Sequence, residues 1–446
     1  MNNIFGTDGV RGKANTGYIT PENAMKLAVS VINYYANTNH KTVNTKFTVV
    51  IGKDTRLSGY MLEPALTSGF IAAGADVVLL GPVPTPTVAF MTRSLRADFG
   101  VMISASHNLY YDNGIKFFNS NGFKLSLKDE INISDIFHNS QDLVDPEHMG
   151  KAKRLDDAPG RYIEFVKNSF PKNLSLFDVK IVIDTANGAA YKIAPQVFWE
   201  LGAEIIKIGA EPDGLNINKA CGATDTALLQ KTVTAQNADI GIALDGDADR
   251  LIIVTEEGEV LDGDYVIATI ATDWLETKKL TSKNIVATKM SNIGLERYLN
   301  KIGLDLSRCE VGDKHVLDKM LGISAQIGGE KSGHIIPIDY SSTGDGLIAA
   351  LQILAYIQRK KIKTSDIKTL YTPFPQEFMN IPQIIEISDQ KTIDLIERVK
   401  DQILNNTGRI IIRKSGTENL TRIMIESENK NDIIRAIEEI KKTFIL

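Results

Sequence analysis

The segment "FTVVIGKDTRLSGYMLEPALTSGFIAAGADVVLLG" (residues 47–81) has the pattern of a strand, a helix and a second strand. Its two ends, 47–52 and 76–81, are nearly continuous apolar runs, which is typical of strands buried on both faces. A helix between two such strands is the usual connection between parallel neighbours in one sheet. A helical pattern over 20–37 precedes this segment, and a further apolar run at 99–104 follows it. We therefore predict an α/β domain with a mostly parallel sheet.

The same alternation of strands and helices recurs twice along the chain. Strands are predicted at 179–188, 203–209 and 238–244 and again at 284–289, 307–311 and 325–329. After about residue 368 the predicted order becomes strand, helix, two strands and helix. We expect three similar mixed-sheet α/β domains and a smaller C-terminal α+β domain around a central cleft. The predicted domains are residues 1–155, 156–257, 258–366 and 367–446.

Composition excludes several classes of protein. The 446 residues are 43% hydrophobic and 24% charged, as in ordinary globular proteins, and the formal net charge is −5. A negative balance argues against nucleic acid as a partner. Two distant cysteines predict no disulfide framework. We find neither a signal-peptide pattern nor an apolar run of about 18 residues, so we expect a cytoplasmic protein without a membrane partner.

Polar loops follow the last predicted strand of each α/β unit. They are "SASHN" (104–108), "DGDADR" (245–250) and "GGEKSGH" (328–334), and the C-terminal domain adds "RKSGTEN" (413–419). Ligands of open parallel sheets bind beyond the carboxyl ends of the strands. We therefore expect these four loops to line one cleft.

The loop "DGDADR" predicts a metal site. Asp245, Asp247 and Asp249 stand at alternate positions, so their side chains can share one face. An all-oxygen set suits Mg²⁺ or Ca²⁺ better than zinc. An EF-hand is excluded because Arg250 occupies the position where that loop needs glycine. A phosphatase with an aspartate nucleophile and a solvated turn remain as alternatives.

Ser106 and its neighbours indicate phosphoryl chemistry. Ser106 precedes His107, but no G-x-S-x-G pattern of a serine hydrolase surrounds it. A phosphoserine carries about −1.5 to −2 charges, and Arg11, Lys116 and Arg250 can offset that charge together with the aspartates. We predict that Ser106 accepts and donates a phosphoryl group; a simple Ser/Asn turn is the alternative.

The two remaining loops suit a phosphosugar. Carboxylate and hydroxyl groups bond sugar hydroxyls well, and an Arg with hydroxyls and a glycine can cradle a phosphate. Plain turns are the alternative for both loops. The candidate sugar ligands are Glu330, Ser332 and His334; the candidate phosphate ligands are Arg413, Ser415, Gly416 and Thr417.

The ordered motifs resemble those of the α-D-phosphohexomutase family. The matching stretches are "GTDGVRG", "ISASHN…DNGIKFF", "DGDADR", "GGEKSGH" and "RKSGTE", and "GKDTRLSG" (52–59), "NINKACGATD" (216–225) and "MSNIGLE" (290–296) resemble its bacterial phosphoglucosamine mutase branch. The resemblance implies four domains around a cleft. It also implies interconversion of glucosamine 6-phosphate and glucosamine 1-phosphate, on the route to UDP-N-acetylglucosamine. The sequence departs from the residues usual in this family at Leu109, Lys314, His315, Lys331 and Asn419.

The resemblance also implies roles for single residues. Ser106 corresponds to the phosphorylated serine and a further metal ligand, and the three aspartates correspond to the ligands of one Mg²⁺. Glu330 and Ser332 match the sugar-contacting loop, and Arg413 begins the phosphate-holding loop. A sugar 1,6-bisphosphate is the implied intermediate and activator. Both His107 and Lys116 are candidates for the general base, the latter with a pKa lowered by nearby cations.

Three other functions stay open from the sequence. A phosphoglucomutase or phosphomannomutase would use the same groups. An aspartate-nucleophile phosphatase would not need Ser106, and a calcium-dependent sugar binder would have no turnover. A homodimer is possible.

Overall fold

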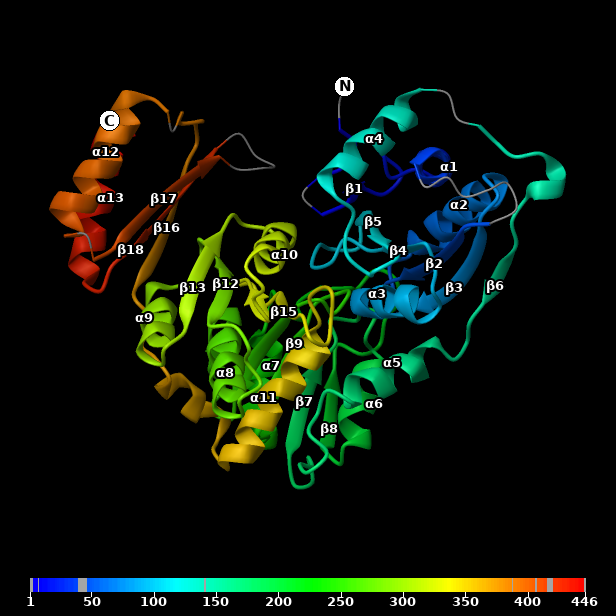
Figure 1. The fold of residues 1–446 in the computed structure, drawn as a ribbon. Helices are drawn as coiled ribbons and strands as arrows, with labels where there is room; N and C mark the ends of the chain where they lie inside the picture. The colour runs from blue at the N-terminus through cyan, green and yellow to red at the C-terminus, as the bar shows by residue number, and fades with distance from the viewer. Residues whose placement is uncertain are drawn as a thin grey trace. The chain divides into compact units, whose positions relative to one another are not determined.

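Four separate β-sheets organise the chain in the computed structural model (Figure 1). The structure describes residues 3–6, 8–38, 46–139, 142–386, 388–405, 407–414 and 420–444. Contacts divide the chain into two compact units, one of residues 1–290 and 306–368 and the other of residues 291–305 and 369–446.

The first sheet is mixed, with strand order β1-β5-β4-β2-β3-β6. Its central strands are parallel, whereas β5 runs antiparallel to both β4 and β1. The strands are β1 (Val10–Lys13), β2 (Thr48–Lys53), β3 (Asp76–Pro82), β4 (Phe99–Ile103), β5 (Asp112–Asn119) and β6 (Ala152–Arg154); the helices are α1 (Pro21–Thr38), α2 (Gly59–Ala72), α3 (Thr85–Ser94) and α4 (Leu127–His138). The predicted strands at 47–52, 76–81 and 99–104 are confirmed, whereas β1, β5 and β6 were not predicted.

The second and third sheets repeat the mixed pattern, with orders β11-β10-β9-β7-β8 and β13-β12-β14-β15. The second has β7 (Lys180–Asp184), β8 (Glu204–Ile208), β9 (Ile240–Leu244), β10 (Leu251–Thr255) and β11 (Val260–Leu261), with α5 (Ala158–Lys167), α6 (Ile193–Glu200) and α7 (Ala227–Gln236). The third has β12 (Asn284–Thr288), β13 (Asp305–Cys309), β14 (Ile327–Gly329) and β15 (Ile335–Pro337), with α8 (Gly263–Glu276), α10 (Asp313–Gly322) and α11 (Gly346–Lys360). The helix α9 (Ile293–Lys301) belongs to the compact unit that contains the C-terminal residues.

The C-terminal sheet is antiparallel, with order β16-β18-β17. Its elements are β16 (Gln376–Ile381), α12 (Gln390–Arg398), β17 (Arg409–Lys414), β18 (Thr421–Glu426) and α13 (Lys430–Phe444). Short helical turns lie at Pro146–His148, Thr364–Thr369 and Val399–Ile403. Three mixed α/β sheets and a smaller α+β domain confirm the predicted fold class. The domain boundaries and the cleft shared by all four loops stay predictions.

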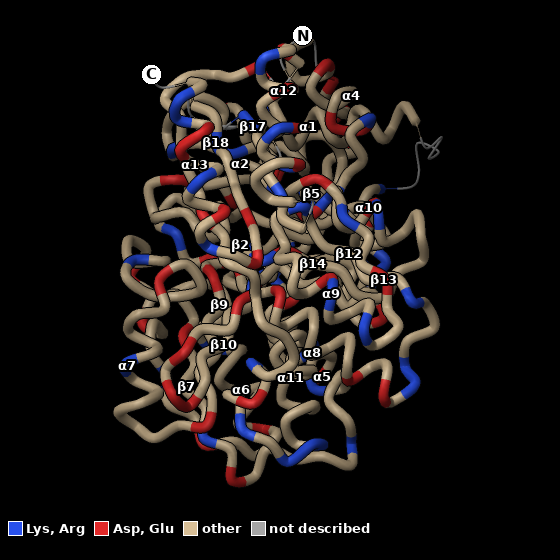
Figure 2. The backbone as a smooth tube through the Cα atoms, turned by 90° about the vertical axis from the view of Figure 1, so that its left-hand side faces the viewer, with Lys and Arg blue, Asp and Glu red and all other residues tan. Residues whose placement is uncertain are grey.

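Each sheet has a buried apolar cluster of its own. Ile51 and Val101 lie in the first cluster, and Val182 in the second. Lys and Arg positions are interspersed with Asp and Glu positions along the backbone (Figure 2). Among the described helices, none is both long and apolar enough to cross a membrane.

The polar loops of the first three sheets follow directly from this topology. β4 leads into residues 104–108, β9 leads into 245–250, and β14 leads into 330–334. An isolated bridge between Arg250 and His334 joins the second and third of these loops. Strand ends therefore place three of the four predicted loops within one compact unit.

Candidate active site

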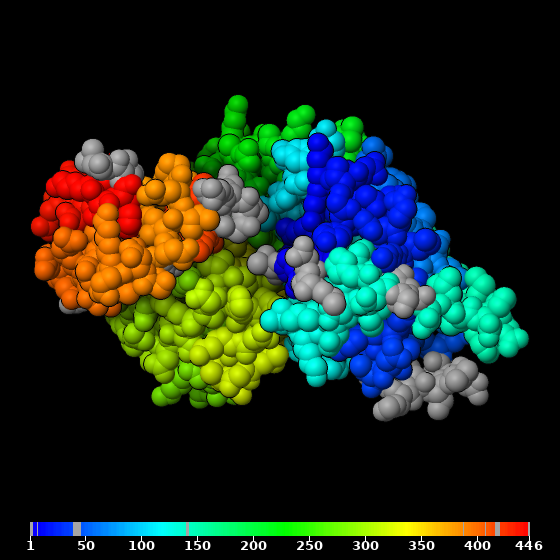
Figure 3. Space-filling view, turned by 90° about the horizontal axis from the view of Figure 1, so that it is seen from above, coloured from blue at the N-terminus to red at the C-terminus, as the bar shows by residue number. Residues whose placement is uncertain are grey.

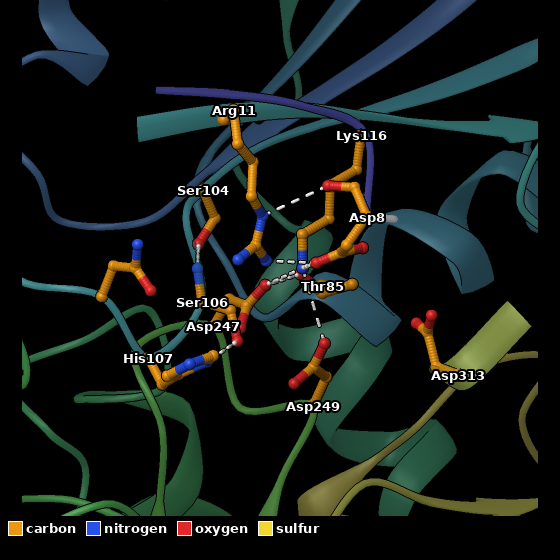
Figure 4. Close-up of polar contacts among 12 residues, drawn as sticks. Asp8, Arg11, Thr85, Ser104, Ser106, His107, Lys116, Asp247, Asp249 and Asp313 are labelled. Carbon is orange, nitrogen blue, oxygen red and sulfur yellow. Dashed lines mark hydrogen bonds and ion pairs between the residues drawn. The ribbon is translucent and has the colours of Figure 1, made fainter. Parts of the chain in front are cut away.

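Ser106 occupies a strained position just beyond β4. Its φ of 53° lies in the left-handed region, which costs a serine about 1–3 kcal/mol unless the surroundings hold it. Its N–H donates to Ser104 Oγ at 2.9 Å (Figure 4). Its own Oγ donates to Asp245 Oδ2 at 2.6 Å. The side chain is buried. This conformation directs the hydroxyl to the acidic loop that follows β9.

Three buried carboxylates meet at this point. Ligand atoms of Asp245, Asp247 and Asp249 all lie within 4.8 Å of one another. Burial, followed by the charges of Asp249 and Asp247, raises the pKa of Asp245 well above its ordinary value. Burial also acts to raise the pKa of Asp249, but Lys116 and His334 outweigh it and hold that pKa well below its ordinary value. The predicted convergence of the three carboxylates is confirmed in geometry.

The acidic loop fits a divalent cation. Within the described part of the chain, Asp247 Oδ1 and Asp249 Oδ1 are buried without a hydrogen-bond partner. A buried unsatisfied oxygen is unfavourable, and hard divalent cations prefer carboxylate oxygens. The loop also needs Gly246, because a Cβ there would lie 2.6 Å from the carbonyl oxygen of Ser106. The residues present therefore suit a metal ion beside Ser106.

Lys116 enters the acidic cluster from β5. Its Nζ lies 2.9 Å from Asp247 Oδ2, 3.1 Å from Asp8 Oδ2 and 3.5 Å from Asp249 Oδ2. Burial acts to lower the pKa of Lys116, but Asp247, Asp8 and Asp249 outweigh it and raise that pKa. The predicted lowering by nearby cations is therefore wrong in this structure, because the neighbours of Lys116 are mostly carboxylates.

His107 lies on the other side of Ser106. Its Nδ1 is 3.5 Å from Ser106 Oγ. Burial, with help from Arg250 and Arg11, lowers the pKa of His107 to about 4. The imidazole is therefore uncharged at neutral pH, and one ring nitrogen can accept a proton.

Arg11 and Arg250 border the cluster and remain partly open to solvent, with 25% and 21% of their side chains exposed. The guanidinium of Arg11 pairs with Asp8. Arg250 Nε lies 4.0 Å from Asp245 Oδ2. Two partly exposed arginine side chains at the border of the acidic cluster suit recognition of a phosphate.

The loop between β14 and β15 packs against the acidic loop. Glu330 is nearly buried and accepts a hydrogen bond from Gly312 N–H at 3.2 Å, whereas Ser332 is exposed. His334 is buried with Nδ1 at 3.6 Å from Asp249 Oδ2, and its Nε2 accepts from Gly344 N–H at 3.2 Å. The structure thus brings His334, and the charge of Glu330, near the second loop. The roles of Glu330, Ser332 and His334 as sugar ligands stay predictions.

The fourth predicted loop belongs to the C-terminal unit. Arg413 lies in β17, opposite Arg422 of β18. Ser415, Gly416 and Thr417 lie outside the described residues. The phosphate-holding role of this loop stays a prediction.

Sequence reasoning missed a chain of mostly half-buried charges that links the first and third domains. Lys124 pairs with both Asp8 and Asp313, and Lys314 Nζ lies 2.9 Å from Glu130 Oε2. In Figure 3, cyan surface from the α4 region meets yellow-green surface from the α10 region. Asp8 lies within the motif "GTDGVRG", and this was the only indication in the sequence that Asp8 belongs to the site. Thr85 was also missed; its Oγ1 donates to Asp247 Oδ2 at 2.6 Å.

Family models cover most of the chain. Residues 2–143, 160–258 and 262–374 match the models described as phosphoglucomutase/phosphomannomutase, alpha/beta/alpha domains I, II and III. Residues 385–442 match the C-terminal domain of the same family. The chain belongs to the phosphoglucomutase/phosphomannomutase family. This finding confirms the resemblance to phosphohexomutases and makes the protein an isomerase.

Individual relatives of this family match along the full length. A phosphoglucosamine mutase of Paramagnetospirillum magneticum is 50% identical over 446 residues, which is 99% of this chain and 98% of the relative. A phosphoglucosamine mutase of Zymomonas mobilis is 49% identical over 98% of each chain. Among solved structures, a phosphoglucomutase/phosphomannomutase family protein from Burkholderia thailandensis aligns with a TM-score of 0.82 at 22% identity, over 99% of this chain and 96% of that one. These matches support the phosphoglucosamine mutase branch and the shared phosphohexomutase fold.

Proposed function

We propose that this isomerase interconverts glucosamine 6-phosphate and glucosamine 1-phosphate through a phosphorylated Ser106. The observation that carries the proposal is the 2.6 Å hydrogen bond from Ser106 Oγ to Asp245, within a buried carboxylate cluster bordered by Arg11 and Arg250. The relatives that share about half of the sequence are named phosphoglucosamine mutase. The product would feed UDP-N-acetylglucosamine synthesis, a cytoplasmic route.

Phosphoryl transfer would proceed in two half-reactions. The bond between phosphorus and Ser106 Oγ breaks while a bond forms to the free hydroxyl of the sugar monophosphate, which gives a sugar 1,6-bisphosphate. The proton of the sugar hydroxyl leaves to a base, and Ser106 Oγ ends protonated. The bisphosphate then turns within the site, and its other phosphoryl group returns to Ser106 by the reverse chemistry. Arg11 and Arg250 would bind the phosphoryl oxygens.

His107 is a better candidate than Lys116 for the general base that accepts the proton of the sugar hydroxyl. His107 is uncharged at neutral pH because burial lowers its pKa to about 4, and its ring nitrogen lies 3.5 Å from the serine oxygen. Lys116 retains its proton because three carboxylates surround it. Lys116 would instead hold those carboxylates in place and stabilise negative charge near the phosphoryl group.

Mg²⁺ is the metal that we propose for the acidic loop. Asp245, Asp247 and Asp249 would hold it, with the phosphorylated Ser106 as a further ligand. When bound, it would supply positive charge against the charge of the transferring phosphoryl oxygens. A structural relative from Aspergillus fumigatus, an N-acetylphosphoglucosamine mutase with a TM-score of 0.65 and 15% identity, was solved with GlcNAc-6P and magnesium.

The experiment that tests the proposal is a comparison of substrates. Relative kcat/KM for glucosamine, glucose and mannose phosphates should favour glucosamine 6-phosphate, and a clear preference for another sugar would replace this substrate with the phosphoglucomutase or phosphomannomutase alternative. Binding without any turnover would instead support a calcium-dependent sugar binder. A possible homodimer stays a prediction that gel filtration with light scattering can test.

Arg413→Ala should raise KM for the sugar phosphate by about 10-fold or more, because an Arg–phosphate contact is charge-assisted. Its melting temperature should stay close to that of the wild type. The matched control is Lys414→Ala, which removes a neighbouring exposed cation that pairs with Glu386. An unchanged KM together with a collapsed melting temperature would make Arg413 a structural residue.

A further inference from the structure

Arg56 is buried in the first domain and forms hydrogen bonds with the backbone at the turn of residues 104–111 between β4 and β5, which we call the serine loop. Its Nη2 donates to the carbonyl oxygens of Ser106 at 3.0 Å and Asn108 at 2.7 Å. Its Nη1 donates to the carbonyl oxygens of Leu109 and Asp112. Three of these carbonyl groups, those of Ser106, Asn108 and Leu109, belong to the turn between β4 and β5, and Asp112 is the first residue of β5. One guanidinium therefore binds four carbonyl groups across this turn and the first residue of β5.

The charge of Arg56 is neutralised within the protein. Its Nε donates to Asp54 Oδ2 at 2.8 Å, and its backbone N–H donates to Asp54 Oδ1 at 2.9 Å. The residue is only 1% exposed. Arg56 thus differs from Arg11 and Arg250, because its donors are all engaged by protein groups and none is left to reach a phosphate.

Asn218 holds the same two carbonyl groups from the second domain. Its Nδ2 donates to the carbonyl oxygens of Ser106 at 2.8 Å and Asn108 at 2.9 Å. The backbone N–H of Asn218 donates to Ala186 O at 2.9 Å, which ties the residue to the loop after β7. Asn218 is 5% exposed. Both lone pairs of each carbonyl are therefore occupied, one by Arg56 and one by Asn218.

The acidic loop, residues 245–250, packs against the carbonyl group of Ser106. A Cβ at Gly246 would lie 2.6 Å from Ser106 O and 2.8 Å from Asn218 Nδ2. The carbonyl of Ser106 is therefore the place where the serine loop, the acidic loop and residues 216–225 meet. A shift of this carbonyl would also move Ser106 Oγ relative to Asp245.

We propose that Arg56 and Asn218 are positioning residues that fix Ser106 in its left-handed conformation, with its oxygen directed at the acidic triad, for phosphoryl transfer. The inference rests on the proposed function of Ser106. A non-glycine residue with positive φ persists only where its surroundings over-determine it, and the two clamped carbonyls supply that constraint. Phosphoryl transfer depends on alignment of the reacting atoms, so a displacement of about 1 Å can cost about 100-fold in rate.

The test compares Asn218→Ala and Asn218→Asp with the control Asn216→Ala. Asn216 lies in the same segment, but its side chain bonds Glu211 O and Asp213 N–H, away from the serine loop. We expect kcat to fall about 10- to 100-fold in the Asn218 variants, with KM within about 2-fold of the wild type. Asn218→Asp should be the slower variant, because a carboxylate in place of the amide would face two carbonyl oxygens. Asn216→Ala should keep the wild-type kcat.

Arg56→Lys provides a second, independent variant. Lysine keeps the positive charge but lacks the planar fork that reaches four carbonyls, so kcat should again fall while KM stays nearly constant. Single-turnover phosphorylation of Ser106 by the sugar 1,6-bisphosphate should slow by a similar factor. If kcat in all these variants equals that of Asn216→Ala, or falls only by the fraction of protein that is unfolded, the positioning role is overturned.

A measurement on the wild-type enzyme distinguishes failure of this inference from failure of the proposed function. Intact mass and site mapping should find phosphate on Ser106 in the wild-type enzyme after incubation with the bisphosphate. A wild type without phosphoserine would overturn the proposed function and, with it, this inference. A phosphorylated wild type with unaffected Asn218 and Arg56 variants would overturn the positioning role alone.

Discussion

Ser106→Ala is expected to abolish mutase activity, with a loss of about 10⁴-fold or more, because the serine oxygen stores the phosphoryl group between the half-reactions. The sugar 1,6-bisphosphate should restore activity to dephosphorylated wild type, since it can phosphorylate the serine again, but not to this variant. Activity should be measured with and without bisphosphate, beside mass spectrometry of the intact protein. The melting temperature should change little, because the position lies in a turn and alanine keeps the same backbone.

Ser104→Ala is the matched control for this experiment. Ser104 lies two residues earlier. Its Oγ accepts the Ser106 N–H and its side chain also bonds Asp54, so the variant loses these hydrogen bonds but keeps the proposed nucleophile. It should therefore carry phosphate at Ser106 and keep measurable activity. Phosphate mapped to Ser104, or an active Ser106→Ala enzyme, would contradict the assignment. An active Ser106→Ala enzyme that loses activity on Asp245→Asn would indicate an aspartate-nucleophile phosphatase.

The order of strands and helices was predictable where apolar runs form buried parallel strands. β2, β3 and β4 are almost continuous apolar segments, and their predicted ranges agree with the structure to within one or two residues at each end. β5 was not predicted, although the motif "DNGIKFF" lies within it. It begins with the polar pair Asp112 and Asn113, and its pairing with β4 follows a turn whose carbonyls Arg56 holds. Such a strand forms through tertiary contacts rather than through its own apolar pattern.

The candidate site was predictable where its members share one loop, as Asp245, Asp247 and Asp249 do. The surroundings of Lys116 were not predictable, because Asp8 reaches it only through the pairing of β1 with β5. The pairs of Lys124 with Asp8 and Asp313 likewise join residues 116 and 189 positions apart. Sequence therefore indicated the cations and the three aspartates near the serine but missed Asp8, the further carboxylate that helps to raise the pKa of Lys116.

Removal of the divalent cation is expected to reduce activity by about 10³-fold or more while the protein stays folded. The loss of activity follows from the charge on the phosphoryl group, which the acidic loop alone would repel. The fold should survive because the carboxylates have protein partners: Lys116 lies 2.9 Å from Asp247, and His334 lies 3.6 Å from Asp249. Activity and thermal unfolding should be measured in EDTA and after titration with Mg²⁺.

The unfolding measurement tests the metal site without relying on catalysis. A ligand at 100 times its dissociation constant stabilises the folded state by about 2.7 kcal/mol, so Mg²⁺ should raise the melting temperature of the wild type. Asp247→Asn should lose that shift together with the activity, because it removes one of the three converging carboxylates. Glu257→Gln is the matched control, since it removes one exposed negative charge from the turn after β10. Full activity in metal-free buffer, or an equal Mg²⁺ shift in Asp247→Asn and Glu257→Gln, would show that the acidic loop does not hold the ion.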